Sequence, residues 1–285
     1  MKETTVTVPT TDALTLQVYR WAPEGRPRAV VQIQHGLGEH AGRYRRFAEV
    51  LTDAGYLVYA PDGRGSGRSA KGNYGKWGRD GWTGWVEDLN QLNALISSQF
   101  RDLPIALFGH SMGSFASQQY LLDHSQDVDA VVLCGSGEPA AIAALLGGSE
   151  PTDLTAFNEG FEERTGFEWL SRDEDEVDRY VADPETAFPT DPFEGIEELA
   201  EAANPHRLAW VRADLPVLII SGTDDPVGLI EPGVEVVSNR YRSVGLKDVT
   251  YIAYPEARHE LLNETNRDEV TADVIAFLDR TVGAG

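Results

Sequence analysis

Short apolar runs alternate with helix-like stretches along most of the sequence, and this alternation limits the possible folds more than any other feature. The runs have the length and the Val and Ile content of strands, and they occupy residues 29–34, 56–60, 105–109, 130–135, 215–222 and 249–255. Because they are apolar on both faces, they are typical of strands buried in a parallel sheet. The pattern predicts an α/β fold with a mostly parallel central sheet and helices on both faces.

Two segments depart from this alternation of strand-like and helix-like stretches. Residues 4–8 and 14–21 alternate apolar and polar positions around a turn-like stretch, and they predict an edge hairpin. Between residues 137 and 206 strand signals disappear, and Ser171 and Glu174 have the spacing of a capping box, which predicts a helix start. We therefore expect a core formed by residues 1–136 and 207–285, interrupted by a helical cap, or lid, at residues 137–206.

The cap carries most of the excess negative charge. The formal net charge is −22, and residues 137–206 hold 19 of the 46 acidic residues but only 3 of the 24 basic ones. Nucleic-acid binding needs clustered cations, so we expect no nucleic-acid partner. The same acidity opposes docking on an anionic membrane.

The sequence also bears on location. The N-terminal residues lack the apolar core of a signal peptide, and no apolar run approaches the roughly 18 residues that a membrane span needs. Cys134 is the single cysteine, so no internal disulfide can form, which suits a reducing compartment. We expect a cytoplasmic protein without stable membrane insertion; the oligomeric state is not indicated.

Residues 109–113, Gly-His-Ser-Met-Gly, lie between a predicted strand and a predicted helix. They fit G-x-S-x-G, the pattern of a serine nucleophile on a tight strand-to-helix turn. In such a turn any side chain at Gly109 or Gly113 would clash. Ser111 would stand at a helix N-terminus, where the backbone favours developing negative charge. The pattern alone is common, but its position makes Ser111 a candidate nucleophile.

A serine nucleophile needs a base and a group that orients the base. In this arrangement an acid and then a histidine follow the serine, each after a later strand. Asp224 and Asp225 follow the strand at 215–222, and His259 follows the strand at 249–255. His259 is therefore the candidate base. The spacing does not choose between the two aspartates, because either could cap the next helix.

The oxyanion formed during attack needs two backbone N–H donors. One should come from the residue after the nucleophile, Met112, and one from the loop after an earlier strand. The glycine-rich stretch 35–40 follows the first buried strand and offers Leu37 as the second donor.

Five segments together resemble the monoacylglycerol lipase and lysophospholipase group of α/β-hydrolases: HGLGEHAGRY, DGRGSGRS, GHSMGS, SGTDDPVG and RHELLNE. They span the chain from about residue 29 to the C-terminus. The resemblance implies the α/β-hydrolase fold, with Ser111 as nucleophile and His259 as base. Asp225 is the fourth residue of Gly222-x-x-Asp and corresponds to the orienting acid.

The same resemblance matches Leu37 and Met112 to the oxyanion-hole positions and the insertion to a lid that shapes the acyl pocket. Eukaryotic members have an apolar, membrane-facing lid, whereas this insertion is acidic. The candidate substrate-binding residues are His35, Gly36, His110, Phe157, Phe161 and Trp169. Large apolar groups in so acidic a segment favour a role in the pocket.

Two further patterns carry little weight. The glycines of residues 63–69 are spaced two apart and no helix is expected before about Trp82, so a dinucleotide site is not supported. His259 and Glu260 resemble the start of H-E-x-x-H, but Asn263 stands where the second histidine would be. We expect no metal and no organic cofactor, and we interpret His35, His40 and His110 as hydrogen-bonded structural histidines rather than metal ligands.

The sequence therefore predicts a serine ester hydrolase that cleaves a neutral, apolar-tailed ester through an acyl-enzyme. The same triad could serve a thioesterase, an aminopeptidase that releases small N-terminal residues, or a perhydrolase. The acidic cap would attract a cationic substrate, which keeps these alternatives open. A non-catalytic binding module is a further alternative, against which the intact order of serine, aspartate and histidine argues.

Overall fold

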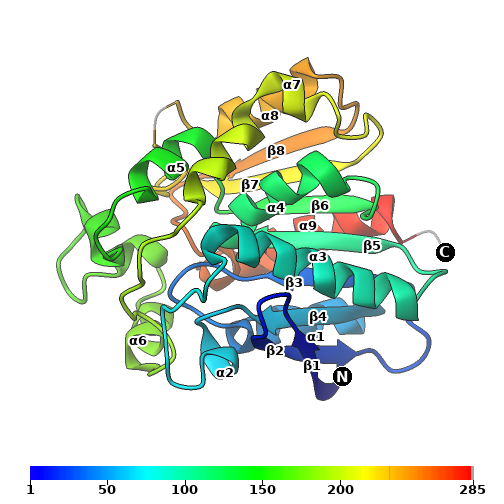
Figure 1. The fold of residues 1–285 in the computed structure, drawn as a ribbon, viewed down its shortest axis with the longest axis horizontal. Helices are drawn as coiled ribbons and strands as arrows, with labels where there is room; N and C mark the ends of the chain where they lie inside the picture. Colours follow the sequence, from blue (N-terminus) through cyan, green and yellow to red (C-terminus); the bar gives the residue numbers. More distant parts are fainter. Residues whose placement is uncertain (231, 284–285) are drawn as a thin grey trace.

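The computed structural model describes residues 1–230 and 232–283, and within them eight strands form one sheet (Figure 1). The strand order is β1-β2-β4-β3-β5-β6-β7-β8. The bounds are β1 (Lys2–Pro9), β2 (Thr15–Ala22), β3 (Ala29–Gln34), β4 (Tyr56–Asp62), β5 (Ile105–His110), β6 (Ala130–Cys134), β7 (Val217–Gly222) and β8 (Val249–Tyr254).

Strands β1 and β2 form an antiparallel edge hairpin, and β2 also pairs antiparallel with β4. The strands from β4 through β3 to β8 pair in parallel. Both the edge hairpin and the mostly parallel central sheet that the sequence predicts are confirmed.

Helices cover both faces of the sheet because successive strand residues point to opposite sides. On one face Leu107 of β5 joins an apolar cluster with α3 (Gly81–Gln99), α4 (Met112–His124) and α8 (Glu235–Ser243). On the other face its neighbour Phe108 packs with α1 (Arg45–Asp53) and α9 (Arg267–Thr281). Strands β3 to β7 are buried along their whole length, as their apolar sequences indicate.

Most of the predicted cap, including α6, lies beyond the carboxyl ends of the parallel strands, at the left of Figure 1, and its last part runs along the top of the view to α7. Its elements are short: α5 (Pro139–Leu146), η2 (Leu154–Asn158), η3 (Glu168–Leu170), α6 (Glu174–Ala182), η4 (Ile196–Ala203) and the start of α7 (Pro205–Leu208). Apolar residues of the cap such as Ile142 and Trp169 join the same cluster as Phe115 of α4. The division of the chain at residues 137 and 206 remains a prediction.

The predicted helix start at Ser171 is wrong. Helix α6 begins at Glu174 and is capped by Asp173, whose carboxylate accepts a hydrogen bond from Asp175 N–H. Ser171 is extended, and its Oγ accepts from Asp173 N–H. Asp173 rather than Ser171 caps the helix because it stands immediately before it, where a capping side chain reaches the free N–H groups. The structure also has a short helix after β4, α2 (Gly67–Ala70), that the sequence did not predict.

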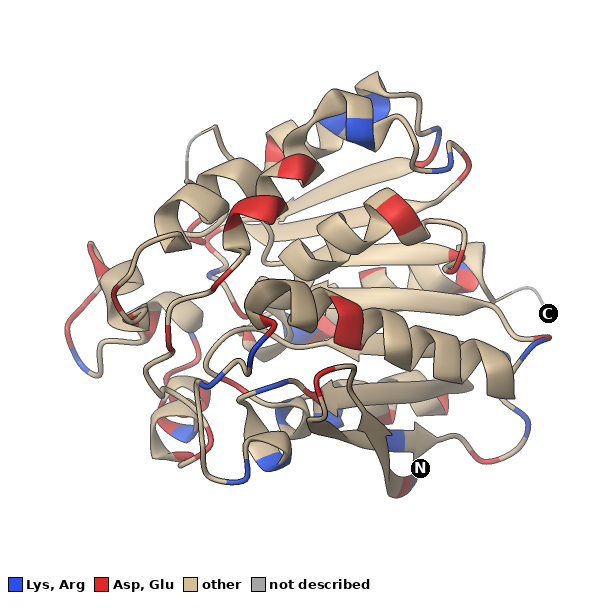
Figure 2. Ribbon diagram, in the orientation of Figure 1, with Lys and Arg blue, Asp and Glu red and all other residues tan. Residues whose placement is uncertain are grey.

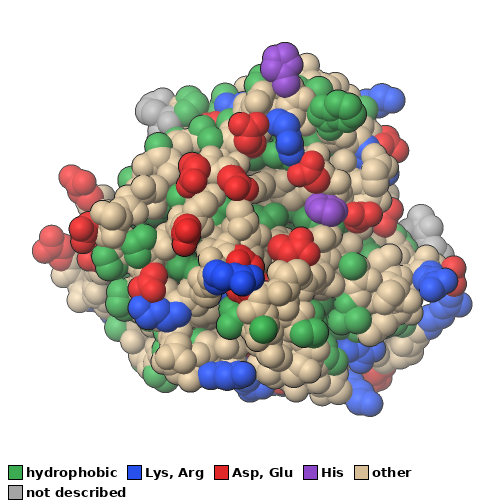
Figure 3. All heavy atoms as spheres, viewed as in Figure 1, with side chains coloured by type: hydrophobic (Ala, Val, Ile, Leu, Met, Phe, Trp, Pro, Cys, Tyr) green, Lys and Arg blue, Asp and Glu red, His purple; other side chains and the backbone are tan. Residues whose placement is uncertain are grey.

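Two short 3₁₀ helices lie beside the site described next, η1 (Ala41–Tyr44) and η5 (Leu261–Asn263). Figure 2 shows acidic residues along the loops and short helices of the cap, and Figure 3 shows acidic side chains protruding there from the molecular surface. In the described part of the chain, no helix has both the length and the hydropathy that crossing a membrane requires.

Candidate active site

Ser111 lies on the turn between β5 and α4. Its φ of 51° and ψ of −122° fall in a region that residues with side chains rarely adopt, and such strain is typical of functional turns. A Cβ atom at Gly109 would lie 2.4 Å from Gly113 O, and one at Gly113 would lie 2.1 Å from Gln34 O. The predicted clash at both glycines is confirmed, so the chain can present Ser111 in this way only with glycine on each side.

His259 is held by Asp225. The Nδ1 atom of His259 lies 2.9 Å from Asp225 Oδ1, which also accepts a hydrogen bond from Val227 N–H. Both side chains are buried. Burial alone would lower the pKa of His259, but the Asp225 carboxylate outweighs it and raises that pKa above its ordinary value. Asp224 is exposed and accepts from Thr223 Oγ1, so Asp225 is the aspartate that contacts the histidine.

The other ring nitrogen of His259 is unused. Nε2 is buried and has no hydrogen-bond partner among residues 1–230 and 232–283. A buried polar atom without a partner is costly and needs an explanation. His259 and Ser111 line the same cavity, so this nitrogen is available to a group that enters beside the serine.

The cavity lies between the sheet edge and the cap and encloses about 510 Å³, part of it open to solvent. Its polar lining comes from Glu39, His110, Ser111, His259 and Glu260. The apolar lining is larger and comes from both parts of the chain: Leu37, Met112, Phe115, Ile142, Leu146, Leu154, Phe157, Trp169, Leu170 and Val227. A mostly apolar pocket with a few converging polar groups is typical of a small-molecule site.

Leu37 and Met112 both line this cavity. Within the described residues, neither backbone N–H group has a hydrogen-bond acceptor. The neighbouring Gly36 N–H does have one, since it donates to Glu39 Oε1 at 2.7 Å, and this contact holds the loop in place. The two unpaired donors are therefore available for an oxyanion at the serine.

Sequence reasoning did not assign roles to three charged residues next to the cavity. Glu39 accepts from Arg43 and from Tyr44 Oη, and Arg43 also makes a two-pronged contact with Glu260. Burial would raise the pKa of Glu39, but the Arg43 guanidinium, together with His110, His35 and the Gly36 N–H, outweighs burial and lowers that pKa to about 2. The only available signal was that these residues belong to the quoted motifs HGLGEHAGRY and RHELLNE.

Only some of the candidate substrate-binding residues line the cavity. Gly36, His110, Phe157 and Trp169 line the cavity, whereas His35 and Phe161 do not. His35 Nδ1 donates to Gly36 O, its Nε2 accepts from Gly63 N–H, and burial lowers its pKa, so it joins two loops as a neutral ring. The Phe161 ring lies under the Arg258 guanidinium, 4.8 Å from its carbon.

His110 lies against His259, with ring centroids 4.9 Å apart. Burial and the neighbouring His259 lower the pKa of His110 to about 4. His110 is therefore neutral near pH 7, which spares His259 the repulsion of a second cation.

Comparison with known proteins shows the family of this chain. The serine aminopeptidase S33 family matches residues 25–266. A monoacylglycerol lipase of Mycolicibacterium smegmatis is 32% identical over 270 residues, which cover 90% of each chain. A monoglyceride lipase of Mus musculus is 31% identical, covering 90% of this chain and 82% of the mouse protein.

Among solved structures, a thermostable carboxyl esterase from Bacillus coagulans in complex with glycerol superposes with a TM-score of 0.85. It is 30% identical, and the match covers 99% of both chains. From the sequence motifs, the fold and these matches together, the chain belongs to the S33 family of α/β-hydrolases.

Proposed function

We propose that this protein is a serine carboxylic ester hydrolase of the monoacylglycerol lipase type. In it Ser111 is the nucleophile, His259 the general base and Asp225 the acid that orients the base. The observation that carries the proposal is the His259 ring. Nδ1 is bound to Asp225, while Nε2 is buried beside the cavity that Ser111 lines and has no hydrogen-bond partner in the described part of the chain.

The reaction follows from these positions. As Ser111 Oγ attacks the ester carbonyl carbon, His259 Nε2 takes its proton, and Asp225 stabilises the imidazolium. The N–H groups of Leu37 and Met112 donate to the carbonyl oxygen, which becomes negatively charged. The C–O bond then breaks, and the alcohol leaves with the proton from His259. Water, deprotonated by the same histidine, attacks the acyl carbon of the acyl-enzyme. The bond from this carbon to Ser111 Oγ then breaks, Ser111 takes the proton back from His259, and the carboxylic acid leaves.

The substrate class follows from the cavity lining. Aliphatic and aromatic side chains from both the core and the cap favour an apolar acyl tail. Relatives named as monoacylglycerol and monoglyceride lipases, and a solved esterase in complex with glycerol, support a neutral ester such as a monoacylglycerol. The cap (residues 137–206) would then set the acyl length. Cys134 is buried and single, which fits the proposed cytoplasmic location.

An aminopeptidase would need a free carboxylate for the substrate's ammonium group. Glu39 and Glu260 reach the cavity, but both are already bound to Arg43. Glu39 further accepts from Gly36 N–H and Tyr44 Oη, and Glu260 from Asn263 Nδ2. These contacts leave neither group free, which favours the neutral ester over a cationic amide.

The test is hydrolysis of p-nitrophenyl esters from acetyl to palmitoyl by the wild type and Ser111→Ala. We expect wild-type turnover and a loss of about 10⁶-fold in kcat in the variant. A monoacylglycerol, a thioester and an alanine p-nitroanilide assayed in parallel compare the alternatives. Equal rates for wild type and variant, or a clear preference for the anilide, would refute the ester hydrolase.

A further inference from the structure

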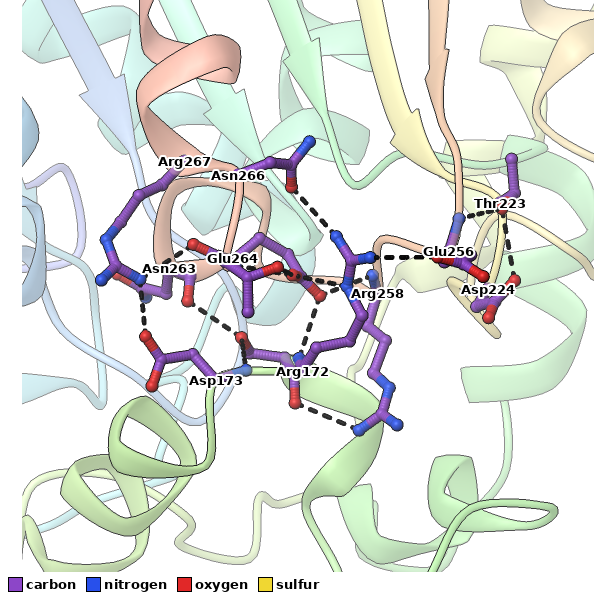
Figure 4. A network of polar contacts seen from close by, with 12 residues as sticks. Arg172, Asp173, Thr223, Asp224, Glu256, Arg258, Asn263, Glu264, Asn266 and Arg267 are labelled. Atoms are coloured by element: carbon purple, nitrogen blue, oxygen red, sulfur yellow. Dashed lines mark hydrogen bonds and ion pairs between the residues drawn. The ribbon is translucent and has the colours of Figure 1, made fainter.

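One short stretch of the cap supplies backbone hydrogen bonds to the loop of His259. Residues 168–173, here called the anchor segment, run beside that loop in the region shown in Figure 4. The N–H of His259 donates to Trp169 O at 3.3 Å, and the N–H of Glu260 donates to Leu170 O at 2.7 Å. The cap therefore supplies hydrogen-bond acceptors to the backbone of the histidine itself.

Glu264 joins the two segments from inside. Its side chain is fully buried. Its Oε1 atom accepts from the N–H groups of Arg172 and Arg258, both at 3.0 Å. Its Oε2 atom accepts from Arg172 Nε at 2.9 Å and from Thr265 N–H at 2.7 Å (Figure 4). One carboxylate thus ties the anchor segment to the residue just before His259.

The charge of Glu264 is maintained by these donors. Burial alone would raise its pKa, but the backbone N–H groups and the Arg172 guanidinium outweigh burial and hold that pKa below its ordinary value. In return, Arg258 Nη1 donates to Glu168 O at 2.6 Å and to Ser171 O at 3.1 Å. The anchor segment and the loop of His259 are therefore joined both by the Glu264 carboxylate and by the Arg258 guanidinium.

Three successive backbone N–H groups, those of Arg258, His259 and Glu260, are fixed in this way. A displacement of about 1 Å at a reacting group can cost about 10²-fold in rate. A group that sets the path of this backbone therefore acts on catalysis through the position of the imidazole.

We propose that Glu264 is a positioning residue for His259: by holding Arg258 against Arg172, it keeps the imidazole between Asp225 and Ser111. This proposal rests on the proposed ester hydrolase function. It also makes residues 168–172 part of the fixed frame of the active site, although they belong to the predicted cap.

The variant that tests this proposal is Glu264→Gln, because the glutamine side chain has nearly the same shape as glutamate but no charge. The amide replaces one acceptor oxygen with an NH₂ donor, which would face the N–H donors that surround it. The matched control is Asp173→Asn. Asp173 also joins the anchor segment to α9, through Arg267 at 2.7 Å, but it contacts neither Arg258 nor His259. Asparagine caps a helix about as well as aspartate, so α6 keeps its start.

Active sites are first counted by the p-nitrophenol released when diethyl p-nitrophenyl phosphate reacts with each protein, so that unfolded chains do not enter kcat. For p-nitrophenyl butyrate we expect Glu264→Gln to lose about 10- to 100-fold in kcat per titrated site, with KM changed less than about 2-fold. Asp173→Asn should stay within about 2-fold of the wild type in both constants.

The pH profile gives a readout that a purely structural role would not change. The charged and titratable groups that face His259 are Asp225, Glu260, Glu39 and His110. If Glu264→Gln loosens the contact with Asp225, the acid limb of kcat/KM moves to lower pH. A wild-type kcat per site and an unchanged limb, with only a lower melting temperature, would overturn the proposal. An equal loss in Asp173→Asn would also overturn it.

If Glu264→Gln yields no titratable enzyme, Arg172→Met takes its place. This variant removes the guanidinium contact and leaves the backbone N–H bond to Glu264. A fall of about 2- to 5-fold in kcat per site supports the proposal, and no change overturns it. Failure of the proposed function would look different, because the wild type itself would then show no turnover that depends on Ser111.

Discussion

The core and the cap of this molecule are stabilised in different ways. In the core, strand β5 is buried at all six positions and alternates its side chains between two apolar clusters. In the cap, α6 has only nine residues, and its start depends on the Asp173 carboxylate. Close by, buried Glu168 accepts hydrogen bonds from Thr165 N–H, Gly166 N–H and Asn158 Nδ2.

The difference determines what each part contributes to the site. The packed sheet holds Ser111 and the loop of Asp225 in fixed positions, since both follow buried strands. The cap adds one wall of the cavity and, through residues 168–173, the acceptors for the His259 backbone. In the proposed mechanism the core therefore carries the chemistry, while the cap selects the acyl chain and supports part of the His259 loop.

The largest effects should come from the core. His259→Ala should lower kcat for p-nitrophenyl butyrate by about 10⁶-fold and Asp225→Ala by about 10⁴-fold. Asp224→Ala should stay within about 2-fold, since this exposed side chain does not contact the histidine. Steady-state kinetics on the three variants measure this. A greater loss in Asp224→Ala than in Asp225→Ala would contradict the assignment of the acid.

The next effect concerns the oxyanion loop. A Cβ atom at Gly36 would lie 2.9 Å from Ser111 Cβ and 3.0 Å from Glu39 Oε1. Gly36→Ala should displace the Leu37 N–H and lower kcat by about 10²- to 10³-fold, the usual cost of losing one such donor. KM should change little. An alanine variant with wild-type kcat would show that this loop does not bind the oxyanion.

The structure of the core could be predicted from the sequence more fully than the cap and its contacts. The strands, the turn at Ser111 and the order of aspartate and histidine could be predicted because local apolar patterns and motifs specify them. Glu264 could not, because burial of a carboxylate depends on distant partners: Arg172 is 92 residues away along the chain. The start of α6 was misplaced because Ser171 and Asp173 are both good capping residues.

The pH profile should show an effect of about tenfold per pH unit on its acid side. His259 must be neutral to accept the serine proton, and Asp225 raises its pKa, so kcat/KM should begin to fall while the pH is still above about 6.5. Asp225→Asn removes the charge that raises the pKa and leaves the burial that lowers it. Its acid limb should therefore move to lower pH. A limb that stays in place would indicate that another group controls it.

The smallest effect should come from the cap wall. Phe157→Ala enlarges the cavity on the side of η2 without touching Ser111, His259 or Asp225. We expect the preferred p-nitrophenyl ester to become longer, while kcat for the acetyl ester stays within about threefold. The comparison between core and cap would fail if this variant lost activity equally on esters of all lengths.

The most direct test of the central claim is the intact mass of the protein after reaction with diethyl p-nitrophenyl phosphate. The account predicts one diethylphosphoryl group per wild-type chain, located by peptide mapping on Ser111, with one equivalent of p-nitrophenol released. Ser111→Ala should gain no mass, and His259→Ala should react far more slowly. An adduct on another residue, or an unmodified wild-type chain, would contradict the assignment of Ser111 as a nucleophile activated by His259.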